Sequence, residues 1–256
     1  MKILTCNIRC CSADDGENGW NHRKEFCIEV IRSQTPDIIC FQEMQSPQFS
    51  DISPAFPEYN YYGMVDEIAG YHPLNSIFYR ADGYTLVSSG GYWLSETPHI
   101  PGTKSWDSNC VRLANWVRLK DNKEGTEFRV INTHIDHISQ PARENQARLI
   151  VEDSSAYPED YPQILTGDMN CDSSNEAIHV FKQGGWIDTY NSVHGTEDPG
   201  NTFHKFLGPQ FDADIGKMDW IFMRGGFKAV NAEVIKDSRE GKFPSDHYFV
   251  SADVTV

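Results

Sequence analysis

The chain has 256 residues, enough for one large α/β domain or two small ones. Hydrophobic residues make up 39% and charged residues 23%, a balance typical of folded globular proteins, so an intrinsically disordered chain is excluded. The formal net charge of -15 would repel a polyanion, which argues against a protein that grips extended duplex nucleic acid and leaves small anionic ligands open.

Cysteine usage and the N-terminal residues bear on the cellular compartment. The seven cysteines are odd in number and contain no C-x-x-C pair, so they give little support to a disulfide framework or a structural zinc site. The first residues lack the apolar core of a signal peptide, and no segment approaches the length of a transmembrane helix. These features predict a cytoplasmic protein without a membrane span. The alternative is a secreted protein whose signal peptide preceded the numbering.

Apolar runs and turn residues predict the elements of the first part of the chain. Pro36 ends a helix whose apolar residues recur at helical spacing, and the Gly90–Gly91 pair predicts a bulge or a tight bend. The predicted elements are a strand at 3–8, a helix at 21–34, a short buried strand at 37–41, and strands at 76–79 and 85–87.

The remaining chain continues the pattern of many strands and few helices. The predicted elements are strands at 116–119, 127–132 and 162–165, helices at 141–153 and 174–183, and final strands at 220–223, 229–235 and 248–254. Since no linker or repeat divides the chain, we predict a single domain over residues 1–256. Two packed sheets with outer helices would bury these strands on both faces.

Polar side chains stand where the predicted strands end, which is where a rigid sheet presents reactive groups. They are Asn7, Glu43, His134, Asp136, Asp168, Asn170, Asp219, Asp246 and His247. Turn preference explains any one Asp or Asn, but it does not explain Glu43 or His134. Carboxylates, amides and imidazoles without a cysteine pair suit a hard cation such as Mg²⁺ or Mn²⁺. Phosphoryl transfer needs such charge neutralisation and an in-line water more than a covalent nucleophile.

Six short blocks in this order resemble the endonuclease/exonuclease/phosphatase superfamily. The blocks are Thr5-Cys-Asn7-Ile-Arg9, Phe41-Gln-Glu43, Asn132-Thr-His134-Ile-Asp136, Thr166-Gly-Asp168-Met-Asn170, Met218-Asp219-Trp-Ile-Phe222 and Ser245-Asp246-His247. The resemblance spans nearly the whole chain and is closest to bacterial members with no assigned substrate. It implies a four-layer α/β/β/α sandwich, in which two packed mixed β-sheets carry outer helices and the active site lies at one edge.

The resemblance also implies where the metal would bind. Glu43, helped by Asn7, would hold the Mg²⁺ or Mn²⁺ ion that bridges the scissile phosphate, and Asp246 would lie close enough to ligate the metal or a water. Without a cation, a carboxylate at Glu43, directly after a buried strand, would be costly. A turn-capping role is the alternative for Asn7.

Catalytic roles follow from the same resemblance. Asp168 would orient or deprotonate the attacking water, with Asn170 beside it. His247 would bind the phosphoryl oxygens and would be held in its tautomer by Asp219. His134 would stabilise the transition state from the other side.

Four further residues are predicted to bind substrate, each with a simpler alternative. Arg112 and Trp116 belong to an Arg-Leu-Ala-Asn-Trp element that resembles one in bacterial members, but the tryptophan is equally explained as core. Arg143 would supply a second positive group or be a solvated arginine near a helix N-terminus. His204 would touch substrate from a loop over the site or be a surface histidine.

The predicted function is a metal-dependent phosphomonoesterase or phosphodiesterase acting on a small or medium phosphorylated molecule. The alternative is an exo- or endonuclease on single-stranded DNA or RNA, which a basic groove with exposed aromatics would favour. A closed pocket ringed by arginine and histidine would favour a small substrate. A catalytically dead binding module and a glycosidase remain as other classes. His72 and Ser76 stand where the bacterial relatives have an acidic residue and a proline, which puts the substrate in doubt.

Overall fold

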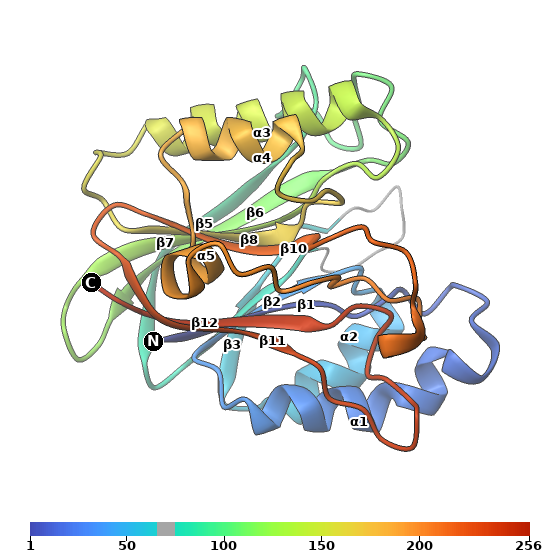
Figure 1. Cartoon of the computed structure of the whole chain (residues 1–256). Helices are drawn as coiled ribbons and strands as arrows, with labels where there is room; N and C mark the ends of the chain where they lie inside the picture. The colour runs from blue at the N-terminus through green and yellow to red at the C-terminus, as the bar shows by residue number, and fades with distance from the viewer. Residues whose placement is uncertain (66–74) are drawn as a thin grey trace.

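A computed structural model of the chain describes residues 1–65 and 75–256, so His72 lies outside the described residues. Two six-stranded mixed sheets pack face to face and helices cover their outer faces, which confirms the predicted α/β sandwich (Figure 1). In this view α3 and α4 lie above one sheet, and α1 and α2 lie below the other. The prediction of a single domain stays a prediction.

The first sheet has strand order β11 (Lys228–Ile235), β12 (Phe249–Thr255), β1 (Lys2–Asn7), β2 (Ile38–Gln42), β4 (Ile77–Arg80), β3 (Tyr59–Tyr62). The second sheet has strand order β5 (Tyr84–Trp93), β6 (Leu113–Asp121), β7 (Glu127–His134), β8 (Gln163–Asp168), β10 (Asp219–Arg224), β9 (Ile187–Asp188). The α-helices are α1 (Trp20–Ser33), α2 (Ser46–Ile52), α3 (Gln140–Ser155), α4 (Glu176–Gln183) and α5 (Thr189–His194).

Central strands are apolar on both faces because each face packs against a different layer. On β1, Ile3 packs in the core between the sheets, whereas Leu4 packs in the layer that also holds Val30 and Ile31 of α1. A third apolar cluster lies between the second sheet and helices α3 and α4. This two-sided burial explains the continuous apolar runs that predicted the strands.

Strand register brings the polar strand ends to one edge. In the second sheet β7 and β8 run parallel with His134 opposite Asp168, and the antiparallel strand β10 places Asp219 opposite the same Asp168. In the first sheet the parallel pair β1 and β2 sets Asn7 opposite Gln42. With β12, which begins two residues after His247, six strands therefore bring polar groups to one end of the sandwich.

A buried polar bridge joins the two sheets beneath that edge. Gln42 Nε2 of β2 donates to Asn132 Oδ1 of β7 at 2.7 Å, and Asn132 Nδ2 donates to the Phe41 carbonyl at 2.8 Å. Both side chains are completely buried. Because a broken bond would leave a buried polar group unpaired, the bridge fixes how the sheets sit relative to each other.

Some predicted details differ from the structure. Helices α2 and α5 were not predicted, since helices this short show little periodicity. The irregularity in β5 lies between Leu86 and Ser88 rather than at the glycine pair, so the prediction of a bulge there was wrong. Gly90 is required for packing instead: a Cβ atom there would lie 2.7 Å from the Trp116 ring.

Within the described ranges, none of the helices is long and apolar enough to cross a membrane.

Candidate active site

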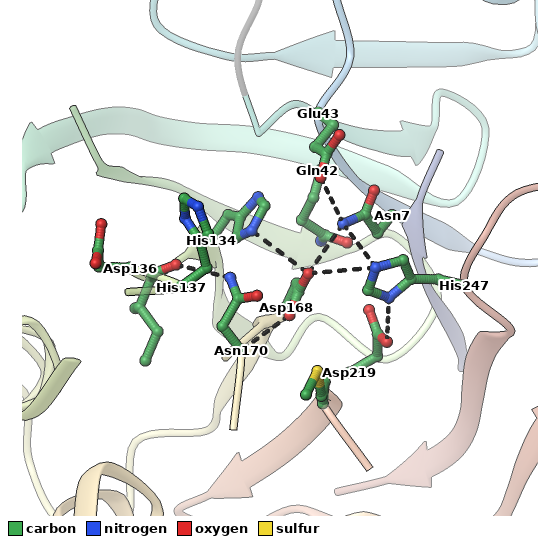
Figure 2. Close-up of polar contacts among 12 residues, drawn as sticks. Asn7, Gln42, Glu43, His134, Asp136, His137, Asp168, Asn170, Asp219 and His247 are labelled. Carbon is green, nitrogen blue, oxygen red and sulfur yellow. Dashed lines mark hydrogen bonds and ion pairs between the residues drawn. The ribbon is translucent and has the colours of Figure 1, made fainter. Parts of the chain in front are cut away.

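Asn7 lies at the centre of the polar edge and touches both sheets (Figure 2). Its Nδ2 donates to Glu43 Oε1 at 3.1 Å and to Asp168 Oδ2 at 2.9 Å. Its Oδ1 accepts the backbone amide of Arg9 at 3.0 Å, which fixes the orientation of the amide group. The amide nitrogen, and not the oxygen, therefore faces the carboxylates. In this orientation Asn7 positions Glu43 and Asp168.

Glu43 follows β2 in a left-handed backbone conformation, with φ of 62°, that is uncommon outside glycine. Its Oε2 accepts the Cys10 amide at 2.9 Å. Burial by itself would raise the pKa of Glu43, but the bonds from Cys10 and Asn7 and the nearby positive charges outweigh burial and lower it. Glu43 is therefore a carboxylate held in its charged form at the edge of the site.

Asp168 ends β8 and receives polar groups from several directions. Its Oδ1 accepts the Asn170 amide at 2.8 Å, and its Oδ2 lies 3.4 Å from His134 Nε2 and 3.8 Å from His247 Nε2. Burial, and then the charge of Asp219, raise the pKa of Asp168 to about 7. A carboxylate with this pKa suits a general base that works near neutral pH.

His247 and Asp219 form a buried pair. The His247 Nδ1 lies 2.8 Å from Asp219 Oδ2, so Nε2 is directed toward Asp168 (Figure 2). Burial would lower the pKa of His247, but Asp219 and Asp168 outweigh it and raise the pKa well above its usual range. The imidazole is therefore held in its protonated form, ready to donate to an anionic oxygen.

His134 faces Asp168 from the opposite side of the site. Burial, followed by the positive charge of Arg112, lowers its pKa well below the usual range. The two histidines around Asp168 are thus kept in different charge states. Asn170, whose φ is also positive at 49°, donates through Nδ2 to the Ile135 carbonyl at 3.0 Å and so ties the two strand ends together.

Asp246 and Arg9 close the site on the side of the first sheet. Arg9 Nε lies 3.0 Å from Asp15 Oδ2 and 3.6 Å from Asp246 Oδ2. Burial raises the pKa of the Asp246 carboxyl. The neighbouring Ser245 hydroxyl donates to the Asn7 carbonyl at 2.7 Å and so fixes the loop that carries His247 to the end of β1.

Six of these residues line one cavity of about 670 Å³: Glu43, His134, Asp168, Asn170, Asp246 and His247. Its lining also includes the apolar residues Val111, Leu113, Phe203, Ile215 and Met218. The Phe203 ring lies 5.0 Å from the His247 ring. The cavity has the size and mixed lining typical of a small-molecule site.

The donor groups fit a divalent cation. Asp168, Asp219 and His247 offer ligand atoms that all lie within 4.8 Å of one another and could hold a metal ion. Within that trio, one Asp219 oxygen is already bonded to His247, while its buried Oδ1 has no hydrogen-bond partner among the described residues. Glu43 and Asp246 add two carboxylates at the same cavity. This excess of carboxylate oxygens suits a hard cation.

Asp136 does not line the cavity. Its carboxylate accepts the amides of Ile138, Ser139 and Asn109 at 2.7 to 2.9 Å and the Ser108 hydroxyl at 3.0 Å. Burial would raise its pKa, but these bonds outweigh burial and lower it to about 2. Asp136 anchors the loop that carries residues 110–113 to the cavity wall.

Of the four predicted substrate residues, the structure brings only Arg112 to the cavity. Trp116 packs against Gly90 and under the Arg129 guanidinium, because alternation along β6 turns it to the outer layer. Arg143 donates to Gln140 and to the Asp136 carbonyl. His204 is 1% exposed, and its Nδ1 accepts the Gly208 amide at 3.1 Å. None of these three residues lines the cavity, and the alternative of a surface histidine is wrong for His204 because that residue is buried.

Sequence reasoning missed several residues of the cavity. Arg9 stands within the first matched block, and His137 directly follows Asp136, so both were adjacent to predicted groups. Cys10, Gln45 and Cys110 also line the cavity. No pattern in the sequence marked these three, because loop residues reach the site through tertiary folding.

Comparisons with known proteins agree with this geometry. A model of the Endonuclease/Exonuclease/phosphatase family matches residues 4–247. The solved structure of an endonuclease/exonuclease/phosphatase from Bacteroides vulgatus is 31% identical, with a TM-score of 0.89, and the match covers 100% of this chain and 98% of that chain. A mannosyl-6-phosphatase from Bacteroides thetaiotaomicron is 28% identical, with a TM-score of 0.87 and 100% coverage of both chains.

A curated relative shares only part of its length. Nocturnin from Drosophila melanogaster is 28% identical over 167 residues, which cover 60% of this chain and 24% of that protein. The chain thus spans about a quarter of the length of this relative.

Proposed function

The chain belongs to the endonuclease/exonuclease/phosphatase family, a group of hydrolases that act on phosphate esters, and from that premise we propose that it is a divalent-metal-dependent phosphomonoesterase of small phosphorylated molecules. The observation that carries the proposal is the meeting of Glu43, Asp168 and His247 around the amide nitrogen of Asn7 in one cavity. Carboxylates for a cation, a base for water and a cationic donor for phosphate are all present there.

We propose that Glu43 and Asp246 hold Mg²⁺ or Mn²⁺ at the cavity. When bound, the ion would neutralise phosphate charge and polarise the ester. Asn7 supports this arrangement by fixing Glu43 and Asp168 relative to each other. Glu43 is favoured over Asp219 as a metal ligand for a structural reason. Asp219 already accepts a hydrogen bond from His247, and without that bond the His247 ring would lose its fixed orientation.

The reaction then depends on the groups around Asp168. Asp168 takes a proton from the attacking water, and Asn170 holds the carboxylate through its backbone amide. His247 donates from Nε2 to a phosphoryl oxygen while Asp219 stabilises the imidazolium. His134, neutral and on the other side of Asp168, is placed to hydrogen bond to the phosphoryl group as charge develops.

Two observations favour a small monoester over a single-stranded nucleic acid. The first is that the site is a cavity of about 670 Å³ with apolar residues in its lining. The second is that Arg9 and Arg112 are the only arginines or lysines among its described lining residues. A nucleic-acid groove would carry a track of such residues. One structural relative of full coverage is a mannosyl-6-phosphatase, so phosphorylated sugars are the first substrates to test.

A phosphate-release screen tests the proposal. Sugar monophosphates, bisphosphates, nucleotides, phosphodiesters and single-stranded oligonucleotides are each incubated with the protein and Mn²⁺ or Mg²⁺. We expect the greatest turnover on a small monoester, complete loss with EDTA, and recovery on adding back metal. Glu43→Gln should raise the metal concentration needed for half-maximal activity more than Asp219→Asn does. Oligonucleotide cleavage as the dominant reaction, or activity that ignores EDTA, would contradict the proposal.

A further inference from the structure

The cavity lining beside His134 includes a pair of residues that the proposed reaction leaves unused. Arg112 comes from the loop before β6, and His137 from the loop after β7. Arg112 Nη2 lies 3.2 Å from His137 Nδ1, and both residues line the cavity. Figure 2 shows His137 beside His134, on the side away from His247 and Asn7.

Among the described residues, Arg112 is a cation without an acidic partner. The cavity's other arginine, Arg9, pairs with Asp15 and faces Asp246, whereas none of the ion pairs found in residues 1–65 and 75–256 includes Arg112. Its Nε is buried and makes no hydrogen bond within the described structure. A guanidinium in a cavity with unused donors is suited to an anionic ligand that supplies the missing acceptors.

His137 extends this donor surface. Arg112 has only donors, so the Nδ1 of His137 must accept and its proton must lie on Nε2. Burial, and then the charge of Arg112, lower the pKa of His137, which keeps the ring neutral in that tautomer. Arg112 thus fixes His137 as a neutral N–H donor beside the guanidinium.

The pair lies beside His134 and on the side away from His247. Figure 2 places His137 beyond His134 as seen from His247, and the charges of Arg112 and His137 both lower the pKa of His134. Val111 and Leu113 flank Arg112 and provide apolar surface for the carbon skeleton of a substrate. A leaving group extending from the phosphate toward this wall would meet Arg112 at its far end.

We propose, on the basis of the function proposed above, that Arg112 and His137 bind a second anionic group on the leaving group. They would thereby select phosphate esters that carry such a second group. The group is a second phosphate or a carboxylate, since both offer acceptors to a guanidinium and an adjacent N–H. Arg112 and His137 are specificity residues in this scheme.

Matched substrates test the pair with Mn²⁺ present. Fructose 1,6-bisphosphate is compared with fructose 6-phosphate, and 3-phosphoglycerate with glycerol 3-phosphate. We expect a higher kcat/KM for the substrate with the second anionic group in at least one couple. The couple that shows this preference tells whether the second group is a phosphate or a carboxylate. Arg112→Gln should lower that preference about 10- to 100-fold, as for loss of a charge-assisted bond. The partner substrate without the second anionic group should lose a smaller factor in kcat/KM, because it offers Arg112 no second group to bind.

Control variants separate selection from general damage. Arg118→Gln removes an arginine of β6 that pairs with Glu127 instead, and it should leave the preference unchanged. His137→Phe should reduce the preference, and His137→Gln, which keeps an N–H donor, should restore part of it. An equal loss on both members of a couple would overturn the inference, because Arg112 would then act on the transferred phosphate.

A binding measurement keeps the inference testable if turnover is absent. The Asp168→Asn variant is titrated calorimetrically with fructose 1,6-bisphosphate and with 3-phosphoglycerate, before and after adding Arg112→Gln. We expect Arg112→Gln to weaken binding of the preferred ligand about 10- to 100-fold. Unchanged affinity, or no binding of either compound, would overturn the inference. Absence of phosphate release in the substrate screen would by itself contradict only the proposed function.

Discussion

Two buried carboxylates at the same end of the second sheet differ in what surrounds them. Asp136 follows β7 and is surrounded by three backbone amides and a serine hydroxyl within 3.0 Å. Asp168 ends β8, and around it lie another carboxylate, two imidazoles and the Asn7 amide. The pKa is lowered to about 2 in the first case and raised to about 7 in the second.

The difference separates a structural carboxylate, Asp136, from the carboxylate that we propose as the base, Asp168. A carboxylate whose lone pairs are filled by fixed donors has no capacity left for a proton or a substrate. One that faces a like charge and movable groups retains that capacity. The sequence shows an aspartate at the end of a strand in both places, so hydrogen-bond saturation is the property that distinguishes them.

The largest expected effect is on turnover at the reactive carboxylate. Asp168→Asn should lower kcat about 10³-fold, as expected for loss of a general base, and the protein should remain folded. Steady-state phosphate release and circular dichroism measure the two quantities. Turnover near the wild-type value would remove the contrast between the two aspartates.

Asp136→Asn should show the opposite profile. One oxygen is replaced by an NH₂ group that cannot accept the amides facing it, so we expect a loss of about 2 to 3 kcal/mol in the free energy of unfolding. Urea denaturation measures it. Because the loop of residues 108–113 is anchored there, KM should rise more than kcat falls. A stable variant with a large kcat defect would assign Asp136 to the chemistry instead.

The dependence of the free energy of unfolding on pH, on the acid side, also tests the role of Asp136. The lowered pKa of Asp136 means that the native state favours its charged form, so its contribution is complete above the unfolded pKa of about 3.9 and is lost as pH falls toward about 2. Unfolding free energies between about pH 5 and about pH 2 should fall less steeply for Asp136→Asn than for wild type. Equal slopes would show that other groups dominate the acid transition.

The smallest expected effect comes from a single donor to the structural carboxylate. Ser108→Ala removes the hydroxyl that lies 3.0 Å from Asp136 Oδ2 and should cost about 1 kcal/mol in the free energy of unfolding. Turnover at saturating substrate should stay near wild type, since three backbone amides still hold Asp136. A loss as large as that of Asp136→Asn would mean that the hydroxyl, not the amides, holds the loop.

The sequence predicted most of the fold because the main strands are buried on both faces and the long helices have one apolar face. Strand β2 and helix α3 are examples, since a continuous apolar run and a proline at the helix start mark them. Helix α2 escaped prediction because its length provides less than two full turns of periodicity. The role of Gly90 was misinterpreted because the group that requires a glycine there, the Trp116 ring, lies on another strand.

For the candidate site, residue type, position at strand ends and the family resemblance predicted side chains that the structure brings to one cavity, among them Glu43, Asp168 and His247. Glu43 could be named from physical chemistry alone, because a carboxylate directly after a buried strand is costly without a cation. Only the tertiary structure decided how they are used: register set His134 and Asp219 on either side of Asp168, and a backbone amide turned Asn7 nitrogen-first toward the carboxylates. It also separated Arg112, in the cavity, from Trp116, four residues later on β6, because side-chain direction depends on the packing of layers that no local pattern records.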